Sequence, residues 1–252
     1  APEEGRERRP PDVRERLPEG LPERHLIWIL RRTLSVLGLA HSRGILHGNI
    51  EPAHIVVRPR DHNVWLVDWC WAIVEPARTG QSFRCLNEDY SPPEARERKP
   101  PLPSSDLYSL GKAMIYAAGG DPADKSLPAS MDPRIQRFLR YFAYESPLGR
   151  PQDAWDMYKQ VDNLRKEVFG KHEFVELIVE AARLQGALIM GGGSYSQDVA
   201  QTFRANTTSA FAFDSHQPAA AAAARRTVHQ ALNPFGKTRE VNNETPIVVA
   251  LA

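Results

Sequence analysis

The chain has 252 residues, of which 42% are hydrophobic and 25% charged, a composition that argues against disorder over the whole length. Its 32 Lys and Arg residues nearly balance 31 Asp and Glu residues, so the formal charge of +1 provides no global field for nucleic acid or anionic lipid. With only two cysteines, a disulfide framework and a Cys-rich zinc site are excluded, and free thiols suit the cytoplasm, where we place the protein.

The first 24 residues combine several prolines with mixed Arg and Glu, which predicts an extended linker with little to bury. This N-terminus is too charged for a secretion signal, and the longest apolar run, Leu26–Leu30, is far shorter than the roughly 20 residues that span a bilayer. We therefore expect neither secretion nor a membrane partner. Because Ala1 stands where an initiator Met would, both a fragment and a processed product remain open.

Apolar residues recur at three- and four-residue steps from His25 to His41, which predicts a core-facing helix. The short apolar runs at 45–46, 54–57 and 64–67 then predict short paired strands. Between Trp69 and Pro103 the periodicity disappears among many prolines, which predicts a long loop. A loop of this length within a compact domain is a candidate functional region.

Helical patterns resume after this loop. Ser104 or Ser105 can cap a strongly apolar helix that Gly119 ends, and its apolar surface predicts that it is buried. Further helices are expected to open at Asp132 and at Pro151, and a last one to run from 172 toward 190. The remaining residues, 191–252, are rich in Gly, Ser, Thr, Asn and Ala and predict a low-complexity tail with one terminal strand at 247–251.

Five motifs follow one another in a single order along this chain. They are the loop His47-Gly48-Asn49-Ile50-Glu51-Pro52-Ala53-His54-Ile55-Val56, then Val67-Asp68-Trp69-Cys70, Tyr90-Ser91-Pro92-Pro93-Glu94, Ser105-Asp106-Leu107-Tyr108-Ser109-Leu110-Gly111 and Arg150-Pro151. In this order they resemble the catalytic loop, D-F-G, A-P-E, D-x-W-S-L-G and pairing arginine of eukaryotic-type Ser/Thr protein kinases. The resemblance covers roughly residues 25–164.

The resemblance implies a mainly α fold with a few short strands, namely the C-terminal lobe of the protein-kinase fold. We divide the chain into a linker (1–24), this lobe (25–168), a helical extension (169–190) and the tail (191–252). It also implies structural roles: His47 is a structural histidine, Glu94 pairs with Arg150 across a buried gap, and Asp106 braces the catalytic-loop backbone. From the residues alone, Asp106 could be a helix cap, and Glu94 and Arg150 surface charges.

The chemistry that the family performs is altered at most positions. Asn49 stands at the catalytic Asp and cannot accept a proton, and Glu51 stands at the Lys near the transferred phosphate, where it would repel ATP. His54 replaces the metal-holding Asn, although Mg²⁺ prefers oxygen ligands. Asp68 remains as the single hard ligand, a weak metal site at best. Cys70 replaces the D-F-G glycine and reduces backbone freedom there.

A phosphate-covering glycine loop and its strand lysine are expected upstream of residue 25, but residues 1–24 contain neither, so the N-terminal lobe is missing from this sequence. The favoured interpretation is an inactive pseudokinase that binds a protein or peptide partner through the segment 69–93 and the face around Asn49 and Glu51. No cofactor is assigned. The alternative is an active Ser/Thr kinase that uses Mg-ATP and receives its N-terminal lobe from upstream or from a partner chain.

The end of the tail, Glu244-Thr245-Pro246-Ile247-Val248-Val249-Ala250-Leu251, resembles the first strand of a von Willebrand factor type A-like domain. In that family a D-x-S-x-S metal motif follows the strand, whereas here Ala252 ends the sequence, so no metal site is assigned. This resemblance implies a third class of function, an adaptor that links the kinase-like lobe to such a domain.

Overall fold

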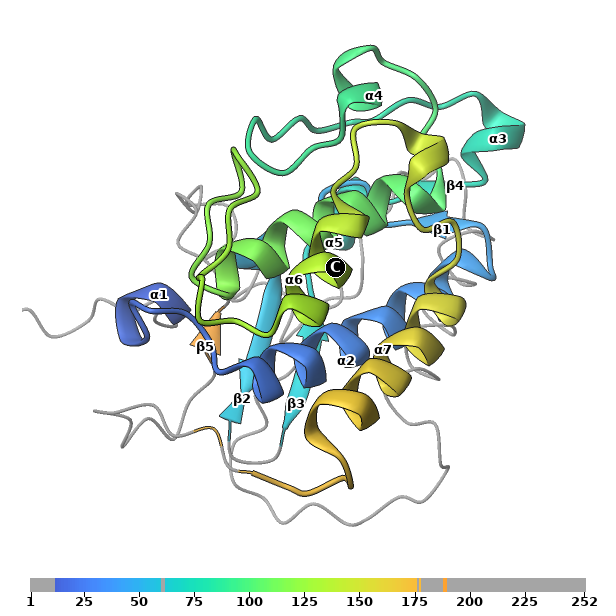
Figure 1. Cartoon of the computed structure of the whole chain (residues 1–252). Helices are drawn as coiled ribbons and strands as arrows, with labels where there is room; N and C mark the ends of the chain where they lie inside the picture. Colours follow the sequence, from blue (N-terminus) through green and yellow to red (C-terminus); the bar gives the residue numbers. More distant parts are fainter. Residues whose placement is uncertain (1–11, 60–61, 176, 178–187, 190–252) are drawn as a thin grey trace, which may run out of the picture.

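The computed structural model describes residues 12–59, 62–175, 177 and 188–189. This part of the chain is mainly helical, with a few short strands (Figure 1). The α-helices are α1 (Val13–Arg16), α2 (Glu23–His41), α3 (Pro76–Thr79), α4 (Pro93–Arg96), α5 (Pro103–Ala117), α6 (Pro133–Phe142) and α7 (Ala154–Phe169). The strands are β1 (Ile45–Leu46), β2 (Ile55–Arg58), β3 (Asn63–Leu66), β4 (Ile73–Val74) and β5 (Leu188–Ile189). Three 3₁₀ turns, η1 (Pro52–His54), η3 (Trp69–Trp71) and η4 (Pro147–Gly149), lie between them.

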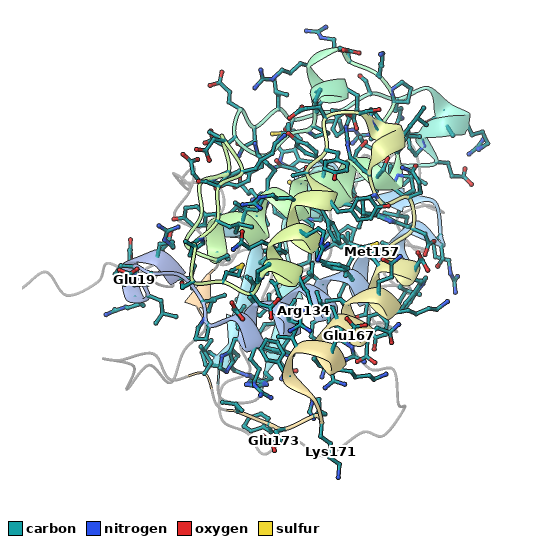
Figure 2. The ribbon with its side chains drawn as sticks, in the orientation of Figure 1. Glu19, Arg134, Met157, Glu167, Lys171 and Glu173 are labelled. Carbon is teal, nitrogen blue, oxygen red and sulfur yellow. The ribbon has the colours of Figure 1, made fainter. Side chains whose placement is uncertain are left out.

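Helix α2 is the centre of the core and lies beside α7 (Figure 1). Its apolar positions at three- and four-residue spacing, among them Leu26, Leu30 and Leu34, are fully buried, as the sequence pattern predicts. Close packing of the two helices depends on Gly38, because a Cβ atom placed there would lie 2.7 Å from the ring of Trp155. At the far end of α7, the Nη1 of Arg134 on α6 donates to the Glu167 carbonyl oxygen over 3.2 Å (Figure 2).

Helix α5 is buried over nearly its whole length and packs against α6. It begins at Pro103, whose missing N–H suits the first helical turn. Gly111 allows the close approach of α6, since a Cβ atom at this position would lie 2.3 Å from the Cβ of Phe142. The buried helix predicted after a cap at Ser104 or Ser105 is therefore present, but it begins two or three residues earlier, at Pro103.

Two small antiparallel sheets position the loop that follows α2. Strands β2 and β3 form a hairpin in which Ile55 pairs with Leu66 and Arg58 with Asn63. Strand β1 pairs with β4 through Ile45 and Val74, and so links the end of α2 to the segment that leads to α5. The short strands predicted at 45–46, 54–57 and 64–67 are present as β1, β2 and β3, and the last two differ from the prediction by one residue at each end.

The structure differs from the sequence predictions at both ends of the described chain. Residues 12–24 do not form an extended linker: α1 opens with a capping box at Asp12, and Val13 and Leu21 are buried in the core. Helix α2 begins two residues before His25. The helix expected from 172 toward 190 is also wrong for the residues described, because 171–175 and 177 are not helical and Leu188–Ile189 is a strand paired with β2.

The sequence pattern missed these features because they depend on distant partners. Arg14 on α1 donates to the carbonyl oxygen of Tyr116 at the end of α5 over 2.9 Å, and the Leu21 N–H donates to that of Ala117 over 2.7 Å. The N-terminal segment thus supplies donors to carbonyl groups at the C-terminus of α5. The expected tail at 191–252, including its von Willebrand-like strand, lies outside the described residues, as do residues 1–11.

Among the described residues, no helix is both long enough and apolar enough to cross a lipid bilayer.

Candidate functional site

The loop between β1 and η1 is held by the carboxylate of Asp106, which lies in the first turn of α5. This carboxylate accepts backbone N–H groups from His47 over 2.8 Å and from Gly48 over 2.9 Å, and it lies 2.9 Å from the Nε2 atom of His41. Burial raises the pKa of Asp106, but the hydrogen bond to His41 and the charge of His41 lower it by more, so the net direction is downward. A buried, ionised carboxylate thus fixes the start of the loop.

His47 is fully buried beneath this loop. Its Nε2 atom lies 2.9 Å from the carbonyl oxygen of Val67, and its Nδ1 atom accepts the backbone N–H of Asn49 over 3.3 Å. Burial dominates and lowers the pKa of His47 to about 4, although Asp106 opposes the shift. The ring is therefore neutral near pH 7 and joins the loop to the strand that leads to Asp68.

His54 lies between two carboxylates. Its Nε2 atom is 3.1 Å from Oδ2 of Asp68 and 3.3 Å from Oε1 of Glu51, while its Nδ1 atom is 2.7 Å from the carbonyl oxygen of Asn49. Both ring nitrogens thus face acceptors, and only the doubly protonated imidazolium can donate from both. Burial lowers the pKa of His54, but Asp68 and Glu51 raise it by more, so the net direction is upward.

Asp68 occupies a left-handed backbone conformation, with φ 63° and ψ 52°, at the entry to η3. Its Oδ2 faces His54, and its Oδ1 accepts the Cys70 thiol proton over 2.7 Å. Burial raises the pKa of Asp68, yet the hydrogen bond and charge of His54 outweigh it and lower the net value. Burial and then Asp68 raise the pKa of Cys70 to about 12, so this thiol stays protonated.

Glu51 connects this site to the segment that precedes α4. Its Oε2 atom accepts the side-chain amide of Asn87, and its Oε1 atom faces His54. The side-chain amide of Asn49, by contrast, makes no hydrogen bond within the described part of the chain. The structure therefore brings together Asn49, Glu51, His54 and Asp68 in one cluster.

Glu94 and Arg150 form a second, separate cluster. The guanidinium Nη1 and Nη2 atoms lie 2.8 Å from Oε1 and Oε2 of Glu94, and the Ser105 hydroxyl donates to Oε1 over 2.7 Å. Burial raises the pKa of Glu94, but the hydrogen bonds from Arg150 and Ser105 lower it by more, so the net direction is downward. The guanidinium also lies over the ring of Tyr108 at 4.7 Å. This bidentate pair ties α4 to the chain that precedes α7.

The cluster around His54 does not fit a magnesium ion. Mg²⁺ requires several oxygen ligands in octahedral geometry, whereas here the facing oxygens of Asp68 and Glu51 both point to the Nε2 atom of His54. More generally, no group of three or more His, Cys, Asp or Glu side chains in the described ranges is arranged to hold a metal ion. We therefore derive no chemical step through a metal here.

Two contributors to these clusters were not predicted from the sequence. His41 lies at the last position of the α2 pattern, where a polar residue reads as solvent-facing, yet its side chain is buried against Asp106. Asn87 lies in an aperiodic segment that offers no local signal for its contact with Glu51. Both contacts join residues far apart in the sequence, so only the tertiary structure reveals them.

Comparisons with known proteins find protein kinases over part of the chain. Serine/threonine-protein kinase F of Synechocystis sp. is 28% identical over 107 residues, which cover 41% of this chain and 21% of that protein. Serine/threonine-protein kinase pkn3 of Myxococcus xanthus is 24% identical over 178 residues, or 58% of this chain and 32% of that protein. Serine/threonine-protein kinase PknA of Nostoc sp. is 36% identical over 100 residues, or 36% of this chain and 17% of that protein.

The matched region spans from under a fifth to about a third of the length of these relatives. No family model matches the chain. The relatives share only partial, low identity with it, but they agree with the helical architecture in indicating one kind of domain. The chain contains a region related to Ser/Thr protein kinases.

Proposed function

We propose that this kinase-like domain is a pseudokinase that transfers no phosphate and acts by binding a protein or peptide. The observation that carries this proposal is the position of the His54 ring, whose Nε2 atom lies 3.1 Å from Asp68 and 3.3 Å from Glu51. The Oδ2 atom of Asp68 and the Oε1 atom of Glu51, two of the carboxylate oxygens that could approach a metal, thus already face the His54 ring.

The neighbouring residues oppose phosphate transfer for a different reason. Asn49 carries a neutral amide that cannot accept a hydroxyl proton, and loss of a general base removes about 10² to 10⁴ of rate. Glu51 carries a negative charge, and at 4 Å two like unit charges repel by about 4 kcal/mol at an effective dielectric constant of 20. The hydrogen bond from Asn87 and the charge of His54 stabilise that carboxylate in place.

The binding surface that we propose is the segment 69–93 with the adjoining face around Asn49 and Glu51. The contact between Asn87 and Glu51 holds part of this segment against the loop. Trp71 and Leu86 are exposed on it by 37% and 51%, so large apolar side chains are available to a partner. Cys70 and Cys85 are both free, which suits a reducing compartment, and we propose the cytoplasm.

The alternative is an active Ser/Thr kinase that uses Mg-ATP with an N-terminal lobe supplied upstream or by a partner. The names of the relatives favour it, because they are described as serine/threonine-protein kinases. Retention of Asp68 and of the loop anchored by Asp106 also agrees with it.

Purified chain with Mg-ATP separates the two functions. The proposal expects no transfer of the γ-phosphate to generic substrates, and little change in melting temperature with Mg-ATP. Asn49→Asp alone should not restore transfer, because Glu51 and His54 remain. Robust transfer that Asp68→Ala abolishes would overturn the proposal and favour the kinase. Loss of binding to an isolated peptide partner after Leu86→Ala, with binding retained after Leu148→Ala at an exposed position in η4, would support the surface named above.

A further inference from the structure

Leu148 differs from the other apolar residues of this domain because nearly all of it lies in solvent. It belongs to the 3₁₀ turn η4, and it is 92% exposed, more than any other large apolar residue in the described part of the chain. A scattered exposed leucine needs no explanation by itself. Its meaning therefore depends on the backbone that carries it and on the surface beside it.

The backbone around this leucine is held in place from both sides of the turn. The buried Arg150 donates from Nε to the carbonyl oxygen of Tyr144 over 2.6 Å, just before the turn. Gln152 donates from Nε2 to the carbonyl oxygen of Pro147, inside the turn, over 2.7 Å. A side chain that stands on a fixed backbone loses less conformational freedom when a partner covers it.

An open cavity of about 510 Å³ lies beside this turn. Ser146 and Gly149, on either side of the Pro147–Leu148 pair, both line the cavity, so Leu148 stands at its rim. Tyr144 lines it too and is 51% exposed, which adds aromatic surface to the wall. An apolar side chain and an open cavity thus lie next to each other on one face of the molecule.

The charges in the cavity wall are balanced, but they are not all paired. Lys125 and Glu145 form an ion pair with each other. Arg140 donates from Nε to the Lys125 carbonyl oxygen over 3.3 Å, and Asp124 accepts the backbone N–H of Ser126 over 2.8 Å. Neither Arg140 nor Asp124 has an ion-pair partner among the described residues, although both line the same cavity. Each copy of the chain therefore offers one guanidinium and one carboxylate to a partner.

We propose that this face binds a second copy of the chain about a two-fold axis, with Leu148 of each copy in the cavity of the other. A two-fold interface makes every contact twice with the roles exchanged, so its surface must be complementary to itself. The leucine beside the cavity meets this condition. The charges meet it as well, because Arg140 of each copy can pair with Asp124 of the other, and the two cations and two carboxylates of the wall favour no partner of single charge.

Sedimentation equilibrium of the whole chain over a series of concentrations tests the proposal. We expect a reversible equilibrium between monomer and dimer for the wild type. Leu148→Ser removes an apolar contact twice from every dimer and should raise the dissociation constant about tenfold or more. The matched control is Leu86→Ser, which replaces a leucine that is 51% exposed in the segment 69–93 and should associate like the wild type.

Charge reversal tests the two-fold arrangement itself. Arg140→Glu and Asp124→Arg should each associate more weakly than the wild type, because each single variant places like charges opposite one another twice in a dimer. An equimolar mixture of the two variants should recover the dimer, since both exchanged contacts then join opposite charges. Damage to the fold could not be repaired by mixing, and the melting temperatures of the separate variants check the fold directly.

A wild-type chain that stays monomeric at every concentration would overturn the proposal, and so would a dimer that Leu148→Ser leaves unchanged. Oligomers that keep growing with concentration would overturn the two-fold axis. A mixture of Arg140→Glu and Asp124→Arg that associates no better than either variant alone would overturn the pairing of these two residues across the interface.

Discussion

Removal of Arg150 should destabilise this domain more than any surface substitution of the same kind. The residue is 1% exposed, and its side chain makes two hydrogen bonds of 2.8 Å to Glu94. It also donates to the carbonyl oxygens of Tyr144 over 2.6 Å and of Glu145 over 2.8 Å. Arg150→Met keeps much of the volume but leaves a buried carboxylate and these carbonyl groups without their donor.

Breaking a buried ion pair by removing one partner costs about 3 to 5 kcal/mol, because the other charge stays buried and unpaired. With a urea m-value of about 2 kcal/mol per molar, a loss of about 4 kcal/mol lowers the unfolding midpoint by about 2 M. Urea titrations followed by tryptophan fluorescence measure this shift. Arg78→Met is the matched control: its ion pair with Glu75 is on the surface, with 76% of the Arg side chain exposed, and should contribute about 0 to 1 kcal/mol.

The pH dependence of stability gives an independent check. The fold lowers the pKa of Glu94 from its ordinary value of about 4.5, so its contribution to stability is present above about pH 4.5 and is lost as pH falls through the lower folded value. This slope should flatten or reverse in Arg150→Met, since the neighbour that keeps Glu94 ionised is gone. A midpoint shift for Arg150→Met as small as that for Arg78→Met would refute the reasoning.

Two further predictions concern a tight contact and a thiol. Gly111→Ala places a Cβ atom 2.3 Å from the Cβ of Phe142 and should lower the free energy of unfolding by about 1 to 3 kcal/mol or more. The control is Gly149→Ala, whose Cβ atom would lie 3.5 Å from its nearest neighbour, so this variant should melt like the wild type. Equal melting temperatures of the two variants would contradict the close packing of α5 on α6. The second prediction concerns the thiol of Cys70, measured in a Cys85→Ser background so that only one cysteine reacts. Because the fold raises the pKa of Cys70 from 9.0 to about 12, less of the reactive thiolate is present at pH 8. Its reaction with a disulfide reagent should therefore be slower in the folded chain than in the urea-unfolded chain, by up to about a thousandfold. Adding Asp68→Ala should speed the reaction, and equal rates in the folded and unfolded chain would count against the hydrogen bond to Asp68.

The helices and the hairpin could be predicted because their information is local. The apolar spacing in α2, the proline that opens α6 and the β-branched runs of β2 and β3 each specify an element without reference to distant residues. The ends of the described chain could not be predicted in this way. Proline and charge in residues 12–24 predict a linker, but Val13 and Leu21 are buried because α5 offers them a surface.

In the candidate site, too, some features follow from the local sequence and others depend on distant residues. Motif order places Asn49, Glu51, His54 and Asp68 in one region, and it suggests the pairing of Glu94 with Arg150. Spacing alone does not show that the two nitrogens of His54 face three acceptors, since Asp68 lies fourteen positions later in the chain.

The most direct test of the central claim is whether the imidazolium of His54 excludes a divalent cation from Asp68. Paramagnetic broadening of amide signals by Mn²⁺ reports binding at residues near 49, 54 and 68, without any need for nucleotide or activity. The account predicts no saturable broadening there for the wild type or for His172→Asn, an exposed control, and clear broadening for His54→Asn, which supplies an oxygen ligand and frees Asp68. Saturable Mn²⁺ binding at Asp68 in the wild type, as tight as in His54→Asn, would contradict it.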